Sequence, residues 1–123
     1  MPATPALVFM VESDQAMRHS FRFSLELDGF EVRTCGTVAE LLAHPDLGTA
    51  CCAVVDGNTL ARDKPDAIAA LEGHQARPPL VLIADHIGRR RFARAIASGL
   101  FHVVETPVLD DALVRCIKAL RRF

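Results

Sequence analysis

Five short runs of apolar or alternating residues recur along the sequence, and each is followed by a stretch in which apolar residues have helical spacing. The runs cover residues 6–11, 30–35, 50–55, 79–84 and 101–104. The second run alternates apolar and polar residues, whereas the other four are almost wholly apolar. Strands without a polar face are typical of a parallel sheet that helices cover on both sides. The sequence therefore predicts an α/β fold around a five-stranded parallel sheet.

The stretches that follow these runs predict five helices, over residues 14–28, 37–44, 65–71, 87–98 and 109–123. In the first of them, Met17, Phe21 and Leu25 form one apolar stripe, and Phe23 with Leu27 forms a second. Five strands that alternate with five helices predict a flavodoxin-like (βα)5 three-layer sandwich with the strand order 2-1-3-4-5. We expect this fold to be a single domain over residues 1–123.

The length and charge of the chain limit the classes of protein to which it can belong. The chain has 123 residues, 24% of them charged and 50% hydrophobic, and its net charge is −1. Nucleic-acid-binding domains usually carry a basic excess, so we expect no direct contact with nucleic acid. No apolar run approaches the roughly 20 residues that span a bilayer, and the first residues lack the basic segment of a secretory signal. We therefore expect a cytoplasmic domain without a membrane contact, whose four cysteines remain reduced thiols.

Acidic residues follow the first and third runs, whose strands are neighbours in the expected order. Glu12 and Asp14 come after the first run, and Asp56 comes directly after the third. Sites in such sheets lie beyond the carboxyl ends of the strands, so these carboxylates would converge there and attract a hard cation. Taken singly, Asp14 has a plainer role as a helix cap, and Asp56-Gly57 is an ordinary turn dipeptide.

The order and spacing of several segments of the sequence point to a resemblance to a known protein family. The segments are residues 11–18, 29–34, 53–56, 79–83, 97–99 and 103–107. Together they resemble the receiver domain of two-component response regulators over nearly the whole chain. The resemblance is closest to receivers that precede helix-turn-helix output domains.

This resemblance implies a set of site residues. In the family an aspartate after the third strand accepts a phosphoryl group from a histidine kinase, and acids after the first strand help to bind magnesium. Asp56 matches the acceptor, Glu12 matches the first acid, and Asn58 stands where a backbone carbonyl is offered to magnesium. Pro107 matches a proline that follows a cis peptide bond, so we expect the bond between Thr106 and Pro107 to be cis.

Several positions depart from the family pattern. Ser13 stands in place of the second acid, Ala84 in place of the hydroxyl residue, and Thr106 in place of the lysine. A neutral hydroxyl weakens the hold on a dication, and threonine cannot supply the positive charge that meets a phosphoryl oxygen. We therefore expect magnesium to bind weakly or not at all, and the phosphorylation site to be degenerate.

We therefore interpret the chain as a receiver-like interaction module that does not depend on phosphorylation and is not an enzyme. The expected partners are a sensor histidine kinase or an output domain, or a second copy through the fourth helix, fifth strand and fifth helix. Arg90, Arg94, Val103 and Arg115 would lie on that face, although the plain role of its basic residues is a solvated surface.

Two alternatives remain open. Asp56 could be a working phosphoacceptor in a site that tolerates Ser13 and Thr106. The altered strand ends could also form a sensor site for a small molecule or a metal.

Overall fold

The five strands form one parallel sheet in the order β2-β1-β3-β4-β5. The computed structural model describes residues 5–107 and 111–121. The strands are β1 (Leu7–Val11), β2 (Glu31–Cys35), β3 (Cys52–Asp56), β4 (Leu80–Ala84) and β5 (Phe101–Glu105). All four strand pairs are parallel. The expected flavodoxin-like architecture and strand order are therefore confirmed.

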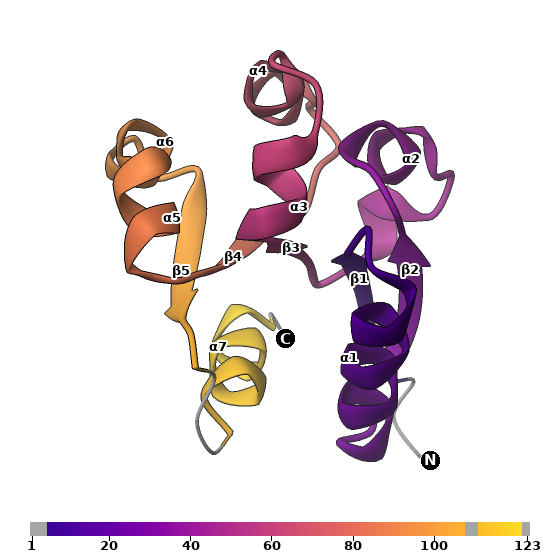
Figure 1. The fold of residues 1–123 in the computed structure, drawn as a ribbon. Coiled ribbons are helices and arrows are strands. Elements are labelled where there is room, and N and C mark those ends of the chain that lie inside the picture. The colour runs from indigo at the N-terminus through magenta and orange to yellow at the C-terminus, as the bar shows by residue number, and fades with distance from the viewer. Residues whose placement is uncertain (1–4, 108–110, 122–123) are drawn as a thin grey trace.

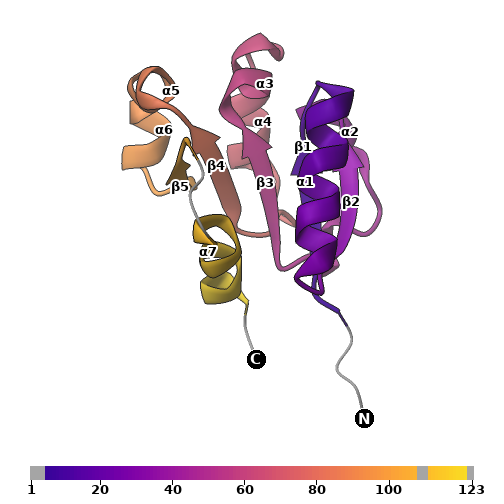
Figure 2. The same cartoon turned by 60° about the horizontal axis from the view of Figure 1, so that its bottom comes forward.

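Helices cover both faces of the sheet (Figure 1). They are α1 (Gln15–Leu27), α2 (Val38–Ala43), α3 (Gly57–Arg62), α4 (Ala67–Gly73), α5 (His86–Arg91), α6 (Ala93–Ala97) and α7 (Ala112–Leu120), with a short 3-10 helix, η1, at Leu47–Thr49. Figure 2 shows α1 and α7 side by side on one face, while α2 to α6 lie on the other. The result is the three-layer sandwich that the sequence predicts.

Two features of the helices differ from the expectation. The helix expected over residues 87–98 is divided at Phe92, which leaves helical geometry with φ −103° and ψ 20° while its ring is buried. A helix that was not expected, α3, begins directly after β3. The first and last residues of the helix expected over 109–123 fall outside the described part of the chain, within which α7 confirms it.

The core has two halves, one on each face of the sheet. Alternate residues of β1 point to opposite faces, as a pleated strand requires, so Phe9 joins the α2–α6 side and Met10 joins the α1–α7 side. Each full burial of such a side chain contributes about 1.5–3 kcal/mol. On α1 only Leu25 is fully buried, whereas Phe23 and Leu27 are 66% and 72% exposed. The second apolar stripe of α1 therefore faces solvent, because a helix on one face of a sheet buries only one stripe.

Local capping fixes where the helices begin. Asp14 accepts a hydrogen bond from the Met17 N–H at 2.9 Å, so it has the capping role considered above. Thr37 accepts from the Glu40 N–H, and the Glu40 carboxylate accepts from the Gly36 N–H. Gly29, with φ +92°, follows α1 in the left-handed region that glycine adopts without strain.

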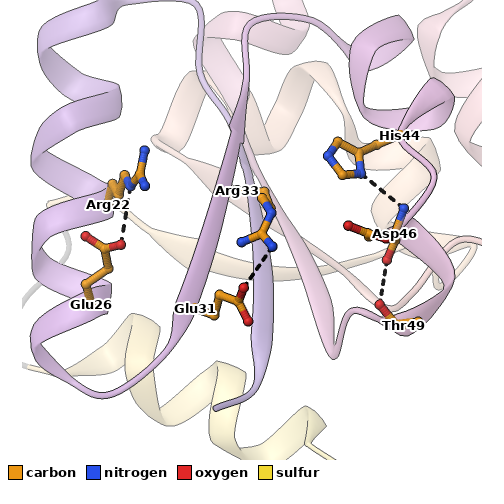
Figure 3. A network of polar contacts seen from close by, with 7 residues as sticks. All are labelled: Arg22, Glu26, Glu31, Arg33, His44, Asp46 and Thr49. Carbon is orange, nitrogen blue, oxygen red and sulfur yellow. Dashed lines mark hydrogen bonds and ion pairs between the residues drawn. The ribbon is translucent and has the colours of Figure 1, made fainter. Parts of the chain in front are cut away.

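Polar contacts near β2 stabilise the surface away from the carboxyl ends of the strands (Figure 3). Arg33 pairs with Glu31 at 2.8 Å, and Arg22 pairs with Glu26 one helical turn along α1 at 3.3 Å. The side chains of both pairs are substantially exposed, so each pair contributes about 0–1 kcal/mol. These contacts belong to the surface rather than to a site.

Two further observations concern the rest of the described chain. None of its helices in residues 5–107 and 111–121 combines the length and apolarity that a bilayer crossing needs. All four cysteines are free thiols, of which Cys35 and Cys52 are buried and Cys51 and Cys116 partly buried. Burial raises the pKa of Cys35 to about 11, which keeps that thiol protonated.

Candidate functional site

The candidate site lies at the carboxyl ends of the four strands β1, β3, β4 and β5. Val11 pairs with Val55 in the parallel ladder, so the next residues along each strand, Glu12 and Asp56, lie side by side. Ala84 ends β4, and Thr106 directly follows β5. The structure thus brings together Glu12 and Asp56, at the edge where the fold places a site, whereas the exposed side chain of Asp14 caps α1.

A threonine that the sequence analysis did not single out connects these acids. The hydroxyl of Thr59, in α3, donates to Glu12 Oε2 at 2.9 Å and lies 3.5 Å from Asp56 Oδ2. It accepts the Ser13 N–H at 2.9 Å, and the Ser13 hydroxyl lies 3.2 Å away. Thr59 is only 3% exposed. One buried hydroxyl therefore joins the residues that follow β1 to the end of β3.

Glu12 is the most deeply buried acid of the site, with 2% of its surface exposed. Its Oε2 accepts both the Thr59 hydroxyl and the Asp14 N–H, the latter at 3.1 Å. Its Oε1 is buried and has no hydrogen-bond partner in the described structure. Burying a carboxylate oxygen without a hydrogen-bond donor costs free energy. Oε1 of Glu12 is therefore the atom of the site whose hydrogen bonding is least satisfied.

Asp56 has an altered acidity. Its partial burial raises its pKa to about 6, and the neighbouring Glu12 adds to the rise through hydrogen bonding and charge repulsion. The nearby backbone N–H groups of Asn58 and Thr59 act in the opposite direction. Among the described residues that line the cavity beside Asp56 there is no lysine or arginine, and the Arg18 guanidinium lies 3.4 Å from the backbone carbonyl oxygen of Glu12 instead.

That cavity is small. It has a volume of about 30 Å³, which is room for about two water molecules. The residues that line it are Asp56, Gly57, Asn58, Ile83, Ala84, Asp85, Gly88 and Thr106. Ala84 and Thr106, two of the three positions that depart from the family pattern, therefore line the same cavity as the expected acceptor. Ala84 presents a methyl group where the family has a hydroxyl residue, and Thr106 presents a neutral side chain where the family has the ammonium group of a lysine.

Close packing keeps the cavity narrow. A Cβ atom on Gly57 would lie 2.9 Å from the Ile83 carbonyl oxygen, and one on Gly88 would lie 3.1 Å from the Ala84 Cβ. Asp85, which stands beside the cavity, accepts the Gly88 N–H at 2.7 Å and so caps α5. The Thr106–Pro107 bond is cis, as expected.

The donor set fits magnesium poorly. Magnesium takes six oxygen ligands at about 2.0–2.1 Å in octahedral geometry. Asn58 lies in the first turn of α3 and lines the cavity beside Asp56. Ser13 brings no charge, and the Thr59 hydroxyl already stands within hydrogen-bonding distance of both acids. Among the described residues, no three His, Cys, Asp or Glu side chains form a group that could hold a metal ion.

Only two of the four residues expected on the partner face line a common groove. Val103 and Arg115 line a groove of about 790 Å³ along β5 and α7, together with Arg89 and Glu105, which form an ion pair with each other. Arg90 and Arg94 lie exposed on α5 and α6 and do not line this groove.

Sequence reasoning missed Thr59 for a definable reason. Thr59 comes three residues after Asp56, a spacing that puts two side chains on one face only if a helix begins at Asp56. The dipeptide Asp56-Gly57 predicts a turn instead. The spacing of three residues between Asp56 and Thr59 was therefore present in the sequence. It predicts a contact between the two side chains only if the helix α3 is known to begin there.

Comparison with known proteins gives one sequence relative among the curated proteins. The chain is 26% identical, over 109 residues, to the C4-dicarboxylate transport transcriptional regulatory protein DctR of Rhodobacter capsulatus. The match covers 87% of this chain and 55% of DctR, so the chain spans about half the length of this curated relative. The chain matches no protein-family model.

Solved structures extend the likeness. The chain is 25% identical to full-length FixJ from B. japonicum with a TM-score of 0.80, over 96% of this chain and 58% of FixJ. The chemotaxis response regulator CheY4 of Vibrio cholerae shares the fold with a TM-score of 0.76 at 18% identity, over 96% of this chain and 100% of CheY4.

Strand order, the position of the acidic site and the likeness to FixJ and DctR all agree. The chain therefore has the fold of response regulator receiver domains and is similar to them over nearly its whole length.

Proposed function

We propose that this receiver domain acts in two-component signalling through contact with a partner protein, without phosphorylation of Asp56. The observation that carries the proposal is the cavity of about 30 Å³ beside Asp56, whose lining, in the part of the chain that the structure describes, includes no lysine or arginine. Phosphoryl transfer depends on positioning and on stabilisation of charge. A phosphoryl group on Asp56 would add negative charge next to buried Glu12, in a cavity with little room and with no lysine or arginine among the described residues that line it.

The partner surface lies on α5, α6, β5 and α7. Exposed arginines at positions 89, 90, 91 and 94 give α5 and α6 a strongly basic surface, and Arg115 lies on α7. Opposite charges on facing surfaces steer association, so the proposed partner carries an acidic surface there. A histidine kinase, an output domain or a second copy of the chain are the candidates. The free thiols support a cytoplasmic place of action, where they would stay reduced.

A second candidate function is that of a working phosphoacceptor at Asp56. One observation favours it: Glu12 Oε1 is buried without a partner, which leaves one carboxylate oxygen free for a cation. The sensor alternative has no comparable observation in its favour.

One experiment separates the two candidates. Backbone amide NMR spectra are recorded for the wild type and for Asp56→Asn, with magnesium and with the phosphate mimic beryllofluoride. The proposal predicts that the wild-type spectrum stays unchanged by the mimic. Large shifts around Asp56 and along residues 85–107 in the wild type, absent from Asp56→Asn, would instead establish a working acceptor.

A further inference from the structure

We infer that Thr59 keeps magnesium out of this site: its hydroxyl joins Glu12 to Ser13 and lies beside Asp56, in a closed arrangement that stands in for a bound cation. The inference rests on the proposed function and names the residue that makes the site unreceptive. We call the Thr59 hydroxyl and its contacts with these three residues the hydroxyl latch.

The hydrogen-bonding capacity of the hydroxyl is fully used. A threonine hydroxyl has one proton to donate and two lone pairs that accept. The proton goes to Glu12 Oε2 at 2.9 Å, and the nearer acceptor contacts are the Ser13 N–H at 2.9 Å and the Ser13 hydroxyl at 3.2 Å. No lone pair remains to coordinate a metal ion, so the hydroxyl cannot serve as a ligand without giving up a contact with Ser13.

The position of the Thr59 hydroxyl makes it compete with a cation for the carboxylates of Glu12 and Asp56. A cation that bridges Glu12 and Asp56 must lie between their carboxylates. The Thr59 oxygen already lies 2.9 Å from one of these carboxylates and 3.5 Å from the other. Because magnesium requires ligands at about 2.0–2.1 Å, an ion coordinated by Glu12 Oε2 and Asp56 Oδ2 could enter only by displacing this oxygen and breaking the hydrogen bond to Glu12.

The latch also joins distant parts of the chain. The residues that it connects are separated by 46 and 47 positions in the sequence, and Thr59 is almost completely buried. It therefore fixes the segment between β1 and α1 against α3, as a shared metal ion would do. Ser13 alone does not explain this arrangement, because its hydroxyl and N–H both reach the site only through Thr59.

The test measures magnesium affinity in the full chain by NMR titration. Thr59→Ala removes the hydroxyl and opens space between the acids, whereas Thr59→Ser keeps the hydroxyl and is the matched control. We expect Thr59→Ala to bind magnesium at least tenfold more tightly than the wild type, which corresponds to about 1.4 kcal/mol. Thr59→Ser should stay within threefold of the wild type. An affinity of Thr59→Ala within threefold of the wild type overturns the inference.

A second measurement needs no variant and covers the case in which Thr59→Ala does not fold. The Ser13 N–H of the wild type should be protected from hydrogen exchange, because it donates to buried Thr59. Exchange at the rate of an open peptide would show that the latch does not form. Failure of the proposed function looks different: it appears as beryllofluoride shifts in the wild-type spectrum, whatever Thr59→Ala does.

Discussion

Replacing Asp56 by asparagine should stabilise the domain, and the gain should depend on pH. Burial and the neighbouring Glu12 raise the pKa of Asp56 to about 6. A change of this size from the ordinary value of 3.8 corresponds to about 3 kcal/mol. Since Asp56 is only partly buried, solvent screening reduces the expected effect to about 1–2 kcal/mol.

The direction follows from proton binding in the two states. Between about pH 4 and pH 6 the folded protein holds a proton on Asp56 that the unfolded chain has already lost, so stability falls as pH rises through this window. Above pH 6 the folded state carries the full cost of an ionised Asp56 next to Glu12. An asparagine at position 56 has no such cost at any pH, so the advantage of Asp56→Asn should be present at pH 8 and nearly absent at pH 4.

Urea denaturation of both proteins at several pH values between 4 and 8 measures this difference. With a slope of about 1–3 kcal/mol per molar urea for small domains, the midpoint of Asp56→Asn should exceed that of the wild type by about 0.3–2 M at pH 8. Titrating groups remote from Asp56 are common to both proteins and cancel in the comparison. A stability difference that stays constant from pH 4 to pH 8 refutes the assignment of a raised pKa to Asp56.

Two further substitutions test the packing around the site, each with a matched control. Gly57→Ala should destabilise the domain by about 1–3 kcal/mol, because its new Cβ would lie 2.9 Å from a carbonyl oxygen of β4. Gly73→Ala, where nothing lies within 4 Å, should cost nothing or stabilise slightly, and equal losses in the two variants would contradict this account. Asp85→Ala should cost about 0.5–2 kcal/mol through loss of the cap of α5. Asp66→Ala removes a residue at the start of α4 that makes no side-chain capping bond, so urea denaturation should show a smaller loss.

Most of the fold could be predicted from the sequence because hydrophobic runs report burial directly. The runs before Glu12 and Asp56 are buried on both faces in the structure, as continuous apolar strands require. That alone fixes which acids meet at the sheet edge, since neighbouring parallel strands end together.

The remaining features depend on tertiary contacts that no local pattern records. Gly57, Asn58 and Thr59 have poor helix propensity, yet α3 begins there because the chain packs against the end of β4. Phe23 and Leu27 have helical spacing but face solvent, because only one side of α1 meets the sheet. The role of Thr59 could be recognised only once the helix α3 was known, because this helix brings its hydroxyl close to Glu12 and Asp56. These contacts are the physical reason that we give for a closed site.

Phosphoryl incorporation tests the central claim most directly. The wild type and Asp56→Asn are incubated with acetyl phosphate and magnesium, and their intact masses are compared by mass spectrometry. The account predicts that both masses stay unchanged, because the cavity beside Asp56 has a volume of only about 30 Å³ and the described residues that line it include no lysine or arginine. A stoichiometric gain of one phosphoryl group in the wild type, lost in Asp56→Asn, would contradict it.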